Sequence, residues 1–274
     1  MAELHSVDIE SVYGAESLSL PSNDKSGGFE IAANVESWLP PAHAVLNMPN
    51  IPEELLHEFD LPRFKKEWNR YLSYVSKRPH TFGTRRVFAH NDAQYGNLLR
   101  LKDSSESVDE HRQVSKPFGR FGRNHANHIR CIIGSQIIVV DFEYAAPNPA
   151  AYDIANHFHE WTANYHCPTP HILEPSRYPT VEERRNFYAS YIRHAVIIAE
   201  DPVLEDNDLL ELMDELDKDV LIWGAASHAG WAIWGIVQAR EDVEAGVTEP
   251  DFNYFGYAKG RMAAFRKDLK DLGI

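Results

Sequence analysis

The sequence predicts a mixed α/β (α+β) fold that is mainly helical and carries its candidate site on a small β-hairpin. Apolar residues at helical spacing recur over most of the chain. Two short β-branched runs, Val87-Phe88-Ala89 and Ile137 to Val140, predict strands. Each run leads directly into polar residues, beginning at His90 and at Asp141, which predicts a site where the strands end.

The first 86 residues predict an arm followed by helices. Residues 1–28 are polar and rich in serine, which predicts a poorly ordered N-terminal arm. Residues 29–86 predict a helical segment that precedes the candidate site. Its first helix should end at Leu39-Pro40-Pro41, because proline disfavours helical geometry in the residue before it. The helices expected in this segment span residues 29–38, about 51–56 and 62–76.

The centre of the chain predicts short strands separated by an insertion. A second strand is expected at 98–101, and a third over 129–140, the end of which should be buried. The polar residues 102–128 between them predict a mobile insertion. Gly119-Arg120-Phe121-Gly122-Arg123 has the composition of a phosphate-binding loop but lacks the strand before it and the helix after it.

Beyond Asp141 the sequence predicts mostly helix. Asp153 is expected near a helix N-terminus, where a negative charge is favourable. Thr180-Val181-Glu182-Glu183 predicts a capping box that opens another helix. The helices expected here span residues 153–165, 180–199, 206–220, 221–244 and 252–272.

Composition excludes several classes of function. The net charge of −14 argues against nucleic acid as a partner, since phosphate-binding surfaces need clustered Lys and Arg. No window of about 18 apolar residues is evident, so no membrane span is expected. The N-terminus lacks the basic and apolar regions of a signal peptide, which predicts a cytoplasmic protein. Cys131 and Cys167 are then expected to be free thiols, and zinc is not expected.

The polar residues after the two strands have the layout of a phosphoryl-transfer site. His90-Asn91-Asp92 with Asn97 gives H-x-D-x-x-x-x-N, and Asp141-Phe142-Glu143 gives D-F-x, the layout of a kinase catalytic loop and metal-binding turn. A carboxylate can accept a proton from a hydroxyl, and magnesium prefers oxygen ligands. Taken singly, Asp92 and Asn97 are better interpreted as turn residues, and Asp141 as a strand-end cap. The combination favours the site.

Longer segments resemble one family of small-molecule kinases. Residues Val87 to Asn97 resemble the phosphotransferase motif of choline and ethanolamine kinases. Asp141 to Ala146, continued by Tyr152 to Trp161, is similar to the second signature of that family. Trp231 to Ala239 resembles its C-terminal aromatic segment. The resemblance extends from about Val87 to about Phe265, interrupted by the insertion.

This resemblance implies a protein-kinase-like fold, with residues 87–274 as its C-terminal lobe. It implies ATP-dependent phosphorylation of choline or ethanolamine, with Mg²⁺, as a step that feeds phospholipid synthesis. Asp92 would be the catalytic base, Asn97 and Asp141 the magnesium ligands. His90 and Gln94 would lie near the active centre. The amine pocket would be lined by Glu160, Tyr165, Trp231, Trp234 and Tyr257.

Such a pocket is physically reasonable. A quaternary ammonium cannot donate a strong hydrogen bond and is held by aromatic faces and nearby negative charge. Trp231 and Trp234 lie three residues apart, so a helix would place both indoles on one face. As an alternative, both could be core residues, since large aromatic side chains mostly supply buried area. Ala245 stands near a position where the family can carry another aromatic residue, so choline against ethanolamine stays open.

The lobe that covers ATP in kinases has no counterpart in the sequence pattern. Only 86 residues precede Val87, and they contain no strand-rich stretch and no lysine on an obvious strand. Ser26-Gly27-Gly28 is the one candidate phosphate loop and lacks a flanking strand. A truncated gene model, a fragment or a degenerate paralogue would give this pattern. A non-catalytic amine-binding or interaction protein is therefore the alternative function. A kinase for sugars or aminoglycosides is disfavoured by the paired tryptophans and Glu160, and a homodimer is left open.

Overall fold

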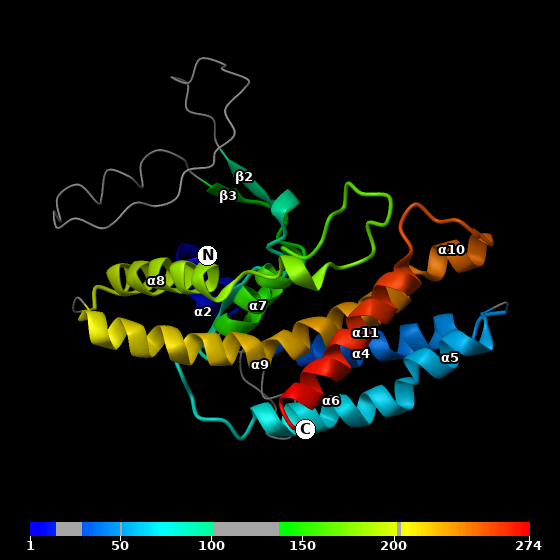
Figure 1. Cartoon of the computed structure of the whole chain (residues 1–274), viewed down its shortest axis with the longest axis horizontal. Helices are drawn as coiled ribbons and strands as arrows, with labels where there is room; N and C mark the ends of the chain where they lie inside the picture. Colours follow the sequence, from blue (N-terminus) through cyan, green and yellow to red (C-terminus); the bar gives the residue numbers. More distant parts are fainter. Residues whose placement is uncertain (15–28, 50, 101–136, 202–203) are drawn as a thin grey trace, which may run out of the picture.

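The computed structural model describes residues 1–14, 29–49, 51–100, 137–201 and 204–274. Helices dominate these residues, and the strands form two separate two-stranded sheets (Figure 1). Part of the predicted arm, the predicted insertion, the first part of the third strand and Cys131 lie outside the described residues.

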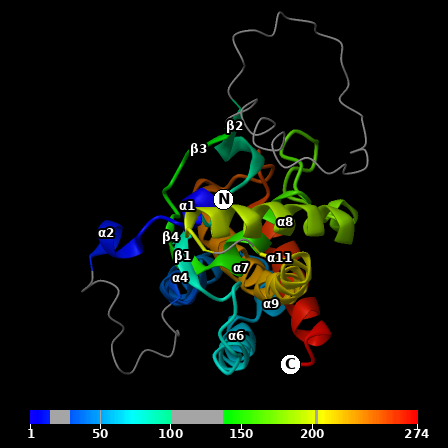
Figure 2. The same ribbon diagram turned by 90° about the vertical axis from the view of Figure 1, so that its left-hand side faces the viewer.

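The helix α9, Asp206–Gln238, is the axis of the fold. Figure 2 shows the other long helices gathered around it. Almost every residue from Ile222 to Ile236 is buried. Close approach depends on Gly230, where an added Cβ would lie 2.6 Å from Cδ1 of Ile31. The helices that pack on α9 are α4 (Glu30–Leu46), α7 (Ala150–Glu160), α8 (Val181–Ile198) and α11 (Tyr254–Asp271).

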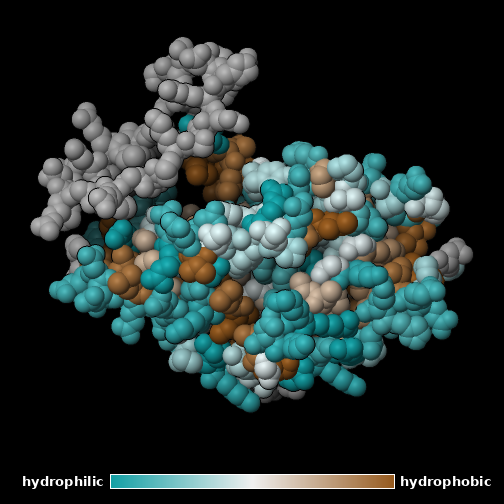
Figure 3. Space-filling model, viewed as in Figure 1, coloured by the Kyte–Doolittle hydropathy of each residue, from teal (hydrophilic) through white to brown (hydrophobic). Residues whose placement is uncertain are grey.

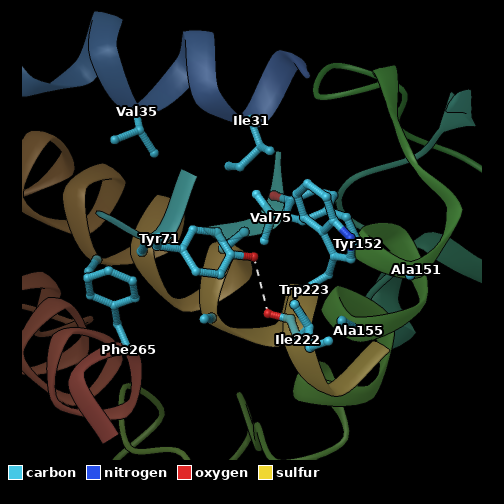
Figure 4. Packing of buried hydrophobic residues seen from close by; sticks show 14 of the residues in the cluster. Ile31, Val35, Tyr71, Val75, Ala151, Tyr152, Ala155, Ile222, Trp223 and Phe265 are labelled. Carbon is cyan, nitrogen blue, oxygen red and sulfur yellow. Dashed lines mark hydrogen bonds between the residues drawn. The ribbon is translucent and has the colours of Figure 1, made fainter. Parts of the chain in front are cut away.

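An aromatic core joins these helices. Tyr71 of α6, Leu61–Val75, donates a hydrogen bond of 3.1 Å from its hydroxyl to the carbonyl of Ile222 (Figure 4). Its ring also lies 6.4 Å from those of Trp223 and Phe265. Burying rings of this size supplies much of the hydrophobic stabilisation of a core.

The continuous α9 spans most of the two helices expected at 206–220 and 221–244. The short helix α10, Arg240–Ala245, comes directly after it. The segment from α9 to α10 also contains an 18-residue window apolar enough to cross a membrane by length and composition, which the sequence reasoning had missed. In this fold 83% of that window is buried inside the protein. That burial is the environment of a core helix.

The N-terminus is more ordered than expected. Residues 1–14 form two short helices, α1 (Ala2–His5) and α2 (Ile9–Tyr13). The His5 side chain is buried and lies 2.8 Å from Asp153 Oδ2 and 2.7 Å from the hydroxyl of Tyr191. The prediction of a loose arm was wrong for these residues, because contacts with distant residues hold them.

The helix α4 runs through Pro40 and Pro41, where the sequence predicted its end. Its apolar stripe continues on both sides of the prolines, with Leu39 and Ala42 both buried. Glu36, whose carbonyl loses its helical donor at Pro40, lies on the exposed face, where water can replace the lost hydrogen bond. Burial of the stripe therefore outweighs the local effect of proline. The next helices, α5 (Glu53–Phe59) and α6, agree with prediction to within a few residues.

The strands pair differently from a single hairpin. β2 (Leu98–Arg100) pairs antiparallel with β3 (Ile137–Val139), as expected. β1 (Arg86–Ala89) pairs with β4 (Ala146–Pro149), a strand that the sequence reasoning missed. Pro147 and Pro149 disguise β4. The Ala150 amide donates to the Arg85 carbonyl, so bonded pairs fall at every second residue and the prolines occupy the intervening positions.

The predicted burial of β3 was wrong. Ile137 is 64% exposed and Ile138 is 42% exposed. Figure 3 shows a hydrophobic patch where β2 and β3 project from the helices. A two-stranded sheet leaves both faces open unless a further element covers them, and no described element covers this one.

The later helices follow their local signals. α7 begins after Pro149, three residues before the predicted start, and ends at Glu160. The capping box at the start of α8 is confirmed, with the Thr180 hydroxyl accepting from the Glu183 amide and the Glu183 carboxylate accepting from the Thr180 amide. α11 lies within two residues of its predicted bounds.

Replacing Pro40 with alanine should stabilise the protein. The variant restores a main-chain donor to Glu36 in the middle of α4, and Pro40 itself is exposed, so no core contact is lost. We expect the free energy of unfolding to rise by about 1–3 kcal/mol, reduced somewhat by the added freedom of the unfolded chain. Urea unfolding followed by circular dichroism measures this. Pro52→Ala, just before α5, is the control and should give no such gain. A destabilised Pro40→Ala variant would contradict the analysis.

Candidate active site

The loop after β1 is built around Asn91, which has a left-handed backbone with φ of 64°. Its side-chain nitrogen donates to the main-chain carbonyl of Tyr144 at 2.8 Å, and its side-chain oxygen accepts from the side chain of Asn148 at 3.0 Å. Its own carbonyl accepts from Asn156 of α7 at 2.7 Å. Positive φ is uncommon outside glycine and costs free energy, so this conformation depends on the surrounding hydrogen bonds.

The buried carboxylate of Asp153, in α7, also holds this loop in place. It accepts the main-chain amides of His90 at 3.0 Å and Asn91 at 2.7 Å, and it pairs with His5. Burial alone would raise the pKa of Asp153, but the hydrogen bonds from His5 and the two amides hold that pKa below its usual value. Asp153 was expected only as a charge near a helix terminus, and the structure gives it this larger structural role.

Asp92 and Asn97 come together as their spacing predicted. The Asn97 amide donates to Asp92 Oδ2 and to the Asp92 carbonyl, both at 2.9 Å. The Gln94 side chain accepts from the Gly96 amide at 2.8 Å and closes the turn. Its own amide lies 3.4 Å from Asn97 Oδ1. The orientation of Asn97 therefore directs its nitrogen to Asp92 and leaves its oxygen toward Gln94.

The electrostatic environment of Asp92 is unusual for a carboxyl group. Burial, and then the negative charge of Glu160, raise its pKa to about 7. The hydrogen bond from Asn97 opposes this rise, and Asp141 and Glu143 add to it. A group with a pKa near neutrality suits general base catalysis.

Asp141 is joined to the catalytic loop through its neighbour Val140. The Val140 carbonyl accepts from His90 Nε2 at 3.0 Å, and its amide donates to the Asn97 carbonyl at 3.0 Å. Asp141 itself has φ of 66° and an exposed side chain. The residue before Asp141 is thus bonded to the side chain of His90 and to the main chain of Asn97. Asp141 is also the second residue of the site with a left-handed backbone.

Carboxylate and amide oxygens gather here, and they suit a hard cation. Within the described ranges no group of three or more His, Cys, Asp or Glu residues forms a ready metal cage. Magnesium does not require one, because it usually takes one or two carboxylates together with substrate phosphates and water. The amide oxygen of Asn97 and the carboxylate of Asp141 fit that need. The charges that raise the Asp92 pKa also show that a cation would be favoured.

Glu160, at the end of α7, anchors the predicted amine pocket. Tyr165 donates from its hydroxyl to Glu160 Oε2 at 2.6 Å. Arg261 donates to Glu160 Oε1 at 2.8 Å and to the Tyr257 hydroxyl at 3.0 Å. The sequence reasoning missed Arg261, which is fully buried, because nothing in its local sequence distinguishes it from a surface arginine of α11.

The predicted aromatic residues form one cluster. The rings of Trp231 and Trp234 meet edge to face at 5.2 Å, and Tyr257 lies 6.2 Å from Trp234. Trp234 is half-buried and donates to the Tyr144 hydroxyl at 3.0 Å. Trp231 lies deeper, and its indole donates to Asn156 Oδ1 at 2.6 Å.

Phe252 completes this cluster and was not predicted. Its ring lies 5.6 Å from that of Tyr257 and 6.5 Å from that of Tyr165. Phe252 precedes α11, although the sequence predicted that the last helix begins at this residue, and its position in the sequence did not indicate its aromatic partners. Among the predicted pocket residues, Glu160, Tyr165, Trp234 and Tyr257 are brought together, and Trp231 supports them from within.

Comparison with known proteins identifies the relatives of this chain. The family model described as Choline/ethanolamine kinase matches residues 1–266. The choline kinase of Schizosaccharomyces pombe is 29% identical over 280 residues, which cover 86% of this chain and 57% of the relative. Probable choline kinase 2 of Arabidopsis thaliana is 34% identical over 178 residues, 65% of this chain and 38% of the relative. This chain therefore spans about half the length, or less, of these curated relatives.

Solved structures support the fold. Choline kinase from Cryptosporidium parvum aligns with a TM-score of 0.62 at 21% identity, covering 100% of this chain and 64% of that one. Plasmodium vivax ethanolamine kinase aligns with a TM-score of 0.62 at 18% identity, covering 97% and 58%. The predicted kinase-like fold is confirmed, and the family match shows that this chain belongs to the choline/ethanolamine kinases.

Asp153→Asn should destabilise the protein strongly. An amide offers one acceptor where the carboxylate serves the amides of His90 and Asn91 and the His5 ring. Breaking such a buried charged cluster costs about 3–5 kcal/mol. Urea unfolding at neutral pH measures the loss. Asp208→Asn, on the exposed side of α9, is the control and should change stability by no more than about 0.5 kcal/mol. Equal effects of the two variants would remove Asp153 from its central role.

Proposed function

We propose that this member of the choline/ethanolamine kinase family transfers the γ-phosphoryl group of ATP to the hydroxyl of choline or ethanolamine. One observation carries the proposal. Asp92, with a pKa of about 7, is held by Asn97 beside Asp141 and close to the aromatic cluster around Glu160. A base, oxygen ligands for magnesium and an amine pocket thereby occupy one region of the fold.

In this reaction Asp92 is the base. Its carboxylate accepts the proton of the substrate hydroxyl as the oxygen attacks phosphorus. The Asn97 amide fixes the carboxylate through its 2.9 Å hydrogen bond. Because catalysis of phosphoryl transfer is mainly positioning and charge stabilisation, a carboxylate held by a rigid loop is the useful arrangement. His90 and Gln94 act as positioning residues for that loop.

Asn97 and Asp141 would hold magnesium, which neutralises charge on the phosphates when it is bound. Asn97 offers its amide oxygen and Asp141 its exposed carboxylate. The hydrogen bonds of the Val140 main chain fix the position of Asp141 relative to Asn97.

The amine end of the substrate binds against the faces of Trp234, Tyr165 and Tyr257. Both oxygens of Glu160 are already bonded, one to Tyr165 and one to Arg261. Glu160 therefore acts chiefly by holding Tyr165 and by balancing the charge of Arg261, and the aromatic faces supply cation–π attraction of about 0.5–2 kcal/mol each. Both substrates are small and water-soluble, and we place the reaction in the cytoplasm.

Removal of the Asp92 carboxylate should abolish turnover. In Asp92→Asn, magnesium-dependent ADP formation with choline and with ethanolamine should fall by about 10²–10⁴-fold, the usual contribution of a positioned base. Amine binding measured by calorimetry should persist, since Asp92 does not belong to the aromatic cluster. Glu143→Gln, which removes a neighbouring exposed carboxylate, is the matched control. If wild type gives no more turnover than Asp92→Asn and yet binds the amines, the alternative of a non-catalytic amine-binding protein replaces this proposal.

Trp234→Leu should weaken choline binding by about fivefold or more, because it removes one aromatic face worth on the order of 1 kcal/mol and disturbs its contact with Tyr257. Calorimetric titration with choline measures this. Trp38→Leu removes another half-buried tryptophan, in α4, and controls for loss of packing. Unchanged affinity in the Trp234 variant would show that the aromatic pocket is wrongly assigned.

A further inference from the structure

A cavity of about 660 Å³, separate from the aromatic cluster, lies among α7, α9 and α11, and residues between His171 and Tyr178 also line it. None of the residues proposed for catalysis or for amine binding lines it. Most of its wall is apolar, which suits the burial of a small organic group. The side chains that carry the argument are His159, Ile172, Tyr178, Leu221, His228 and Asp268.

Two histidines stack in its wall with ring centroids 3.9 Å apart, and both are more than nine-tenths buried. Burial lowers the pKa of His159 to about 3 and lowers that of His228 as well, so both rings are neutral. Two neutral rings leave the cavity without a protonated imidazole to balance negative charge.

Their hydrogen bonds fix the tautomers. Ser227 donates its one hydroxyl proton to Asn156, so His159 Nδ1 must donate to Ser227, and His159 Nε2 is left as an acceptor. The nitrogen His228 Nδ1 accepts from Arg261 at 3.4 Å, which leaves His228 Nε2 as a donor. Nε2 of His159 is therefore a neutral acceptor in the cavity wall to which no described residue donates a hydrogen bond.

The carboxylate of Asp268 completes the site. Neither a hydrogen bond nor an ion pair joins its side chain to any residue of the described ranges. Burial raises the pKa of Asp268 to about 7. The nearest cation in sequence, Lys267, is paired with Asp271. Arg261 is committed to Glu160. Asp268 is thus a half-buried carboxylate without an ion pair in the described ranges. Lys267, which also lines the cavity, compensates its charge only in part, because the Lys267 ammonium is paired with Asp271.

The two acceptors face the same point of α9. A Cβ added at Gly224 would lie 3.4 Å from Nε2 of His159 and 3.9 Å from Oδ2 of Asp268. A group with two N–H donors could satisfy both acceptors, and a positive charge would strengthen its hydrogen bond to the carboxylate.

We propose that this cavity binds a protonated primary or secondary amine that carries an apolar group. The ammonium donates to Asp268 and to His159 Nε2, and the apolar group lies against Leu221, Ile172 and Tyr178. A quaternary ammonium cannot make these bonds, so this site excludes choline, whereas the proposed aromatic pocket needs no N–H donor on its ligand. Arg261 separates the two, since one of its nitrogens contacts Glu160 and another contacts His228.

Calorimetric titration of the whole chain with hexylamine at about pH 8, where the amine is protonated, tests the proposal. Wild type should bind hexylamine, and hexyltrimethylammonium should not compete for this site. Asp268→Asn should weaken hexylamine binding by about tenfold or more, the effect of losing a charged hydrogen-bond partner. Asp208→Asn removes an exposed carboxylate of α9 that does not line the cavity; it is the control and should change affinity by no more than about twofold.

A second variant guards against a folding defect. Gly260 of α11 lines the cavity, and a Cβ there meets nothing within 4 Å, so Gly260→Leu should fold and fill the binding space. It should block hexylamine while choline binding persists.

Trp234→Leu and Asp92→Asn should leave hexylamine binding intact, which keeps the test independent of the proposed reaction. The proposal is overturned if hexylamine fails to bind, if Asp268→Asn binds as well as wild type, or if Trp234→Leu abolishes the binding.

Discussion

The buried carboxylate of Asp153 is the interaction on which the rest of the site depends. It accepts the amides of His90 and Asn91 and pairs with His5 from the N-terminus, while the hydroxyl of Tyr191 in α8 holds the other nitrogen of His5. Four elements distant in sequence thus converge on one charge. A left-handed asparagine is unfavourable by about 1–3 kcal/mol and persists only where its surroundings determine it. Asp153 supplies that constraint, and the position of the adjacent base follows from it.

The same network extends from the catalytic loop to the aromatic cluster. The Asn156 amide donates to the Asn91 carbonyl, and its oxygen accepts from both Trp231 and Ser227. Ser227 in turn holds His159. One turn of α7 therefore sets the loop that carries Asp92, the inner tryptophan and the tautomer of a histidine in the separate cavity. Buried polar networks of this kind specify one arrangement when every member is satisfied.

Local signals predicted those parts of the fold whose cause is local. The α8 capping box, the apolar stripe of α6 and the β1 run each carry their own instruction, and the spacing of Asp92 and Asn97 is a property of one tight loop. β4 and the path of α4 through Pro40 were missed because their pairing and packing partners lie far away in sequence. Arg261 was missed for the same reason, since Glu160, the carboxylate that pairs with it, lies 101 residues away in sequence. In β3 the β-branched residues correctly predicted a strand, but they did not predict whether another element would pack on it.

The charge balance around Arg261 has consequences for selectivity. A fully buried guanidinium beside the proposed amine pocket would repel a cationic ligand if it were not paired, and Glu160 provides that pairing at 2.8 Å. The carboxylate is then largely neutralised, so the aromatic faces must supply much of the attraction for a quaternary ammonium, which needs no donor partner. On the other side of the same guanidinium, Asp268 has no ion pair within the described residues, and it lies near Gly224, as does Nε2 of His159. One buried arginine thereby lies between a proposed pocket that needs no N–H donor on its ligand and a proposed cavity site that requires one.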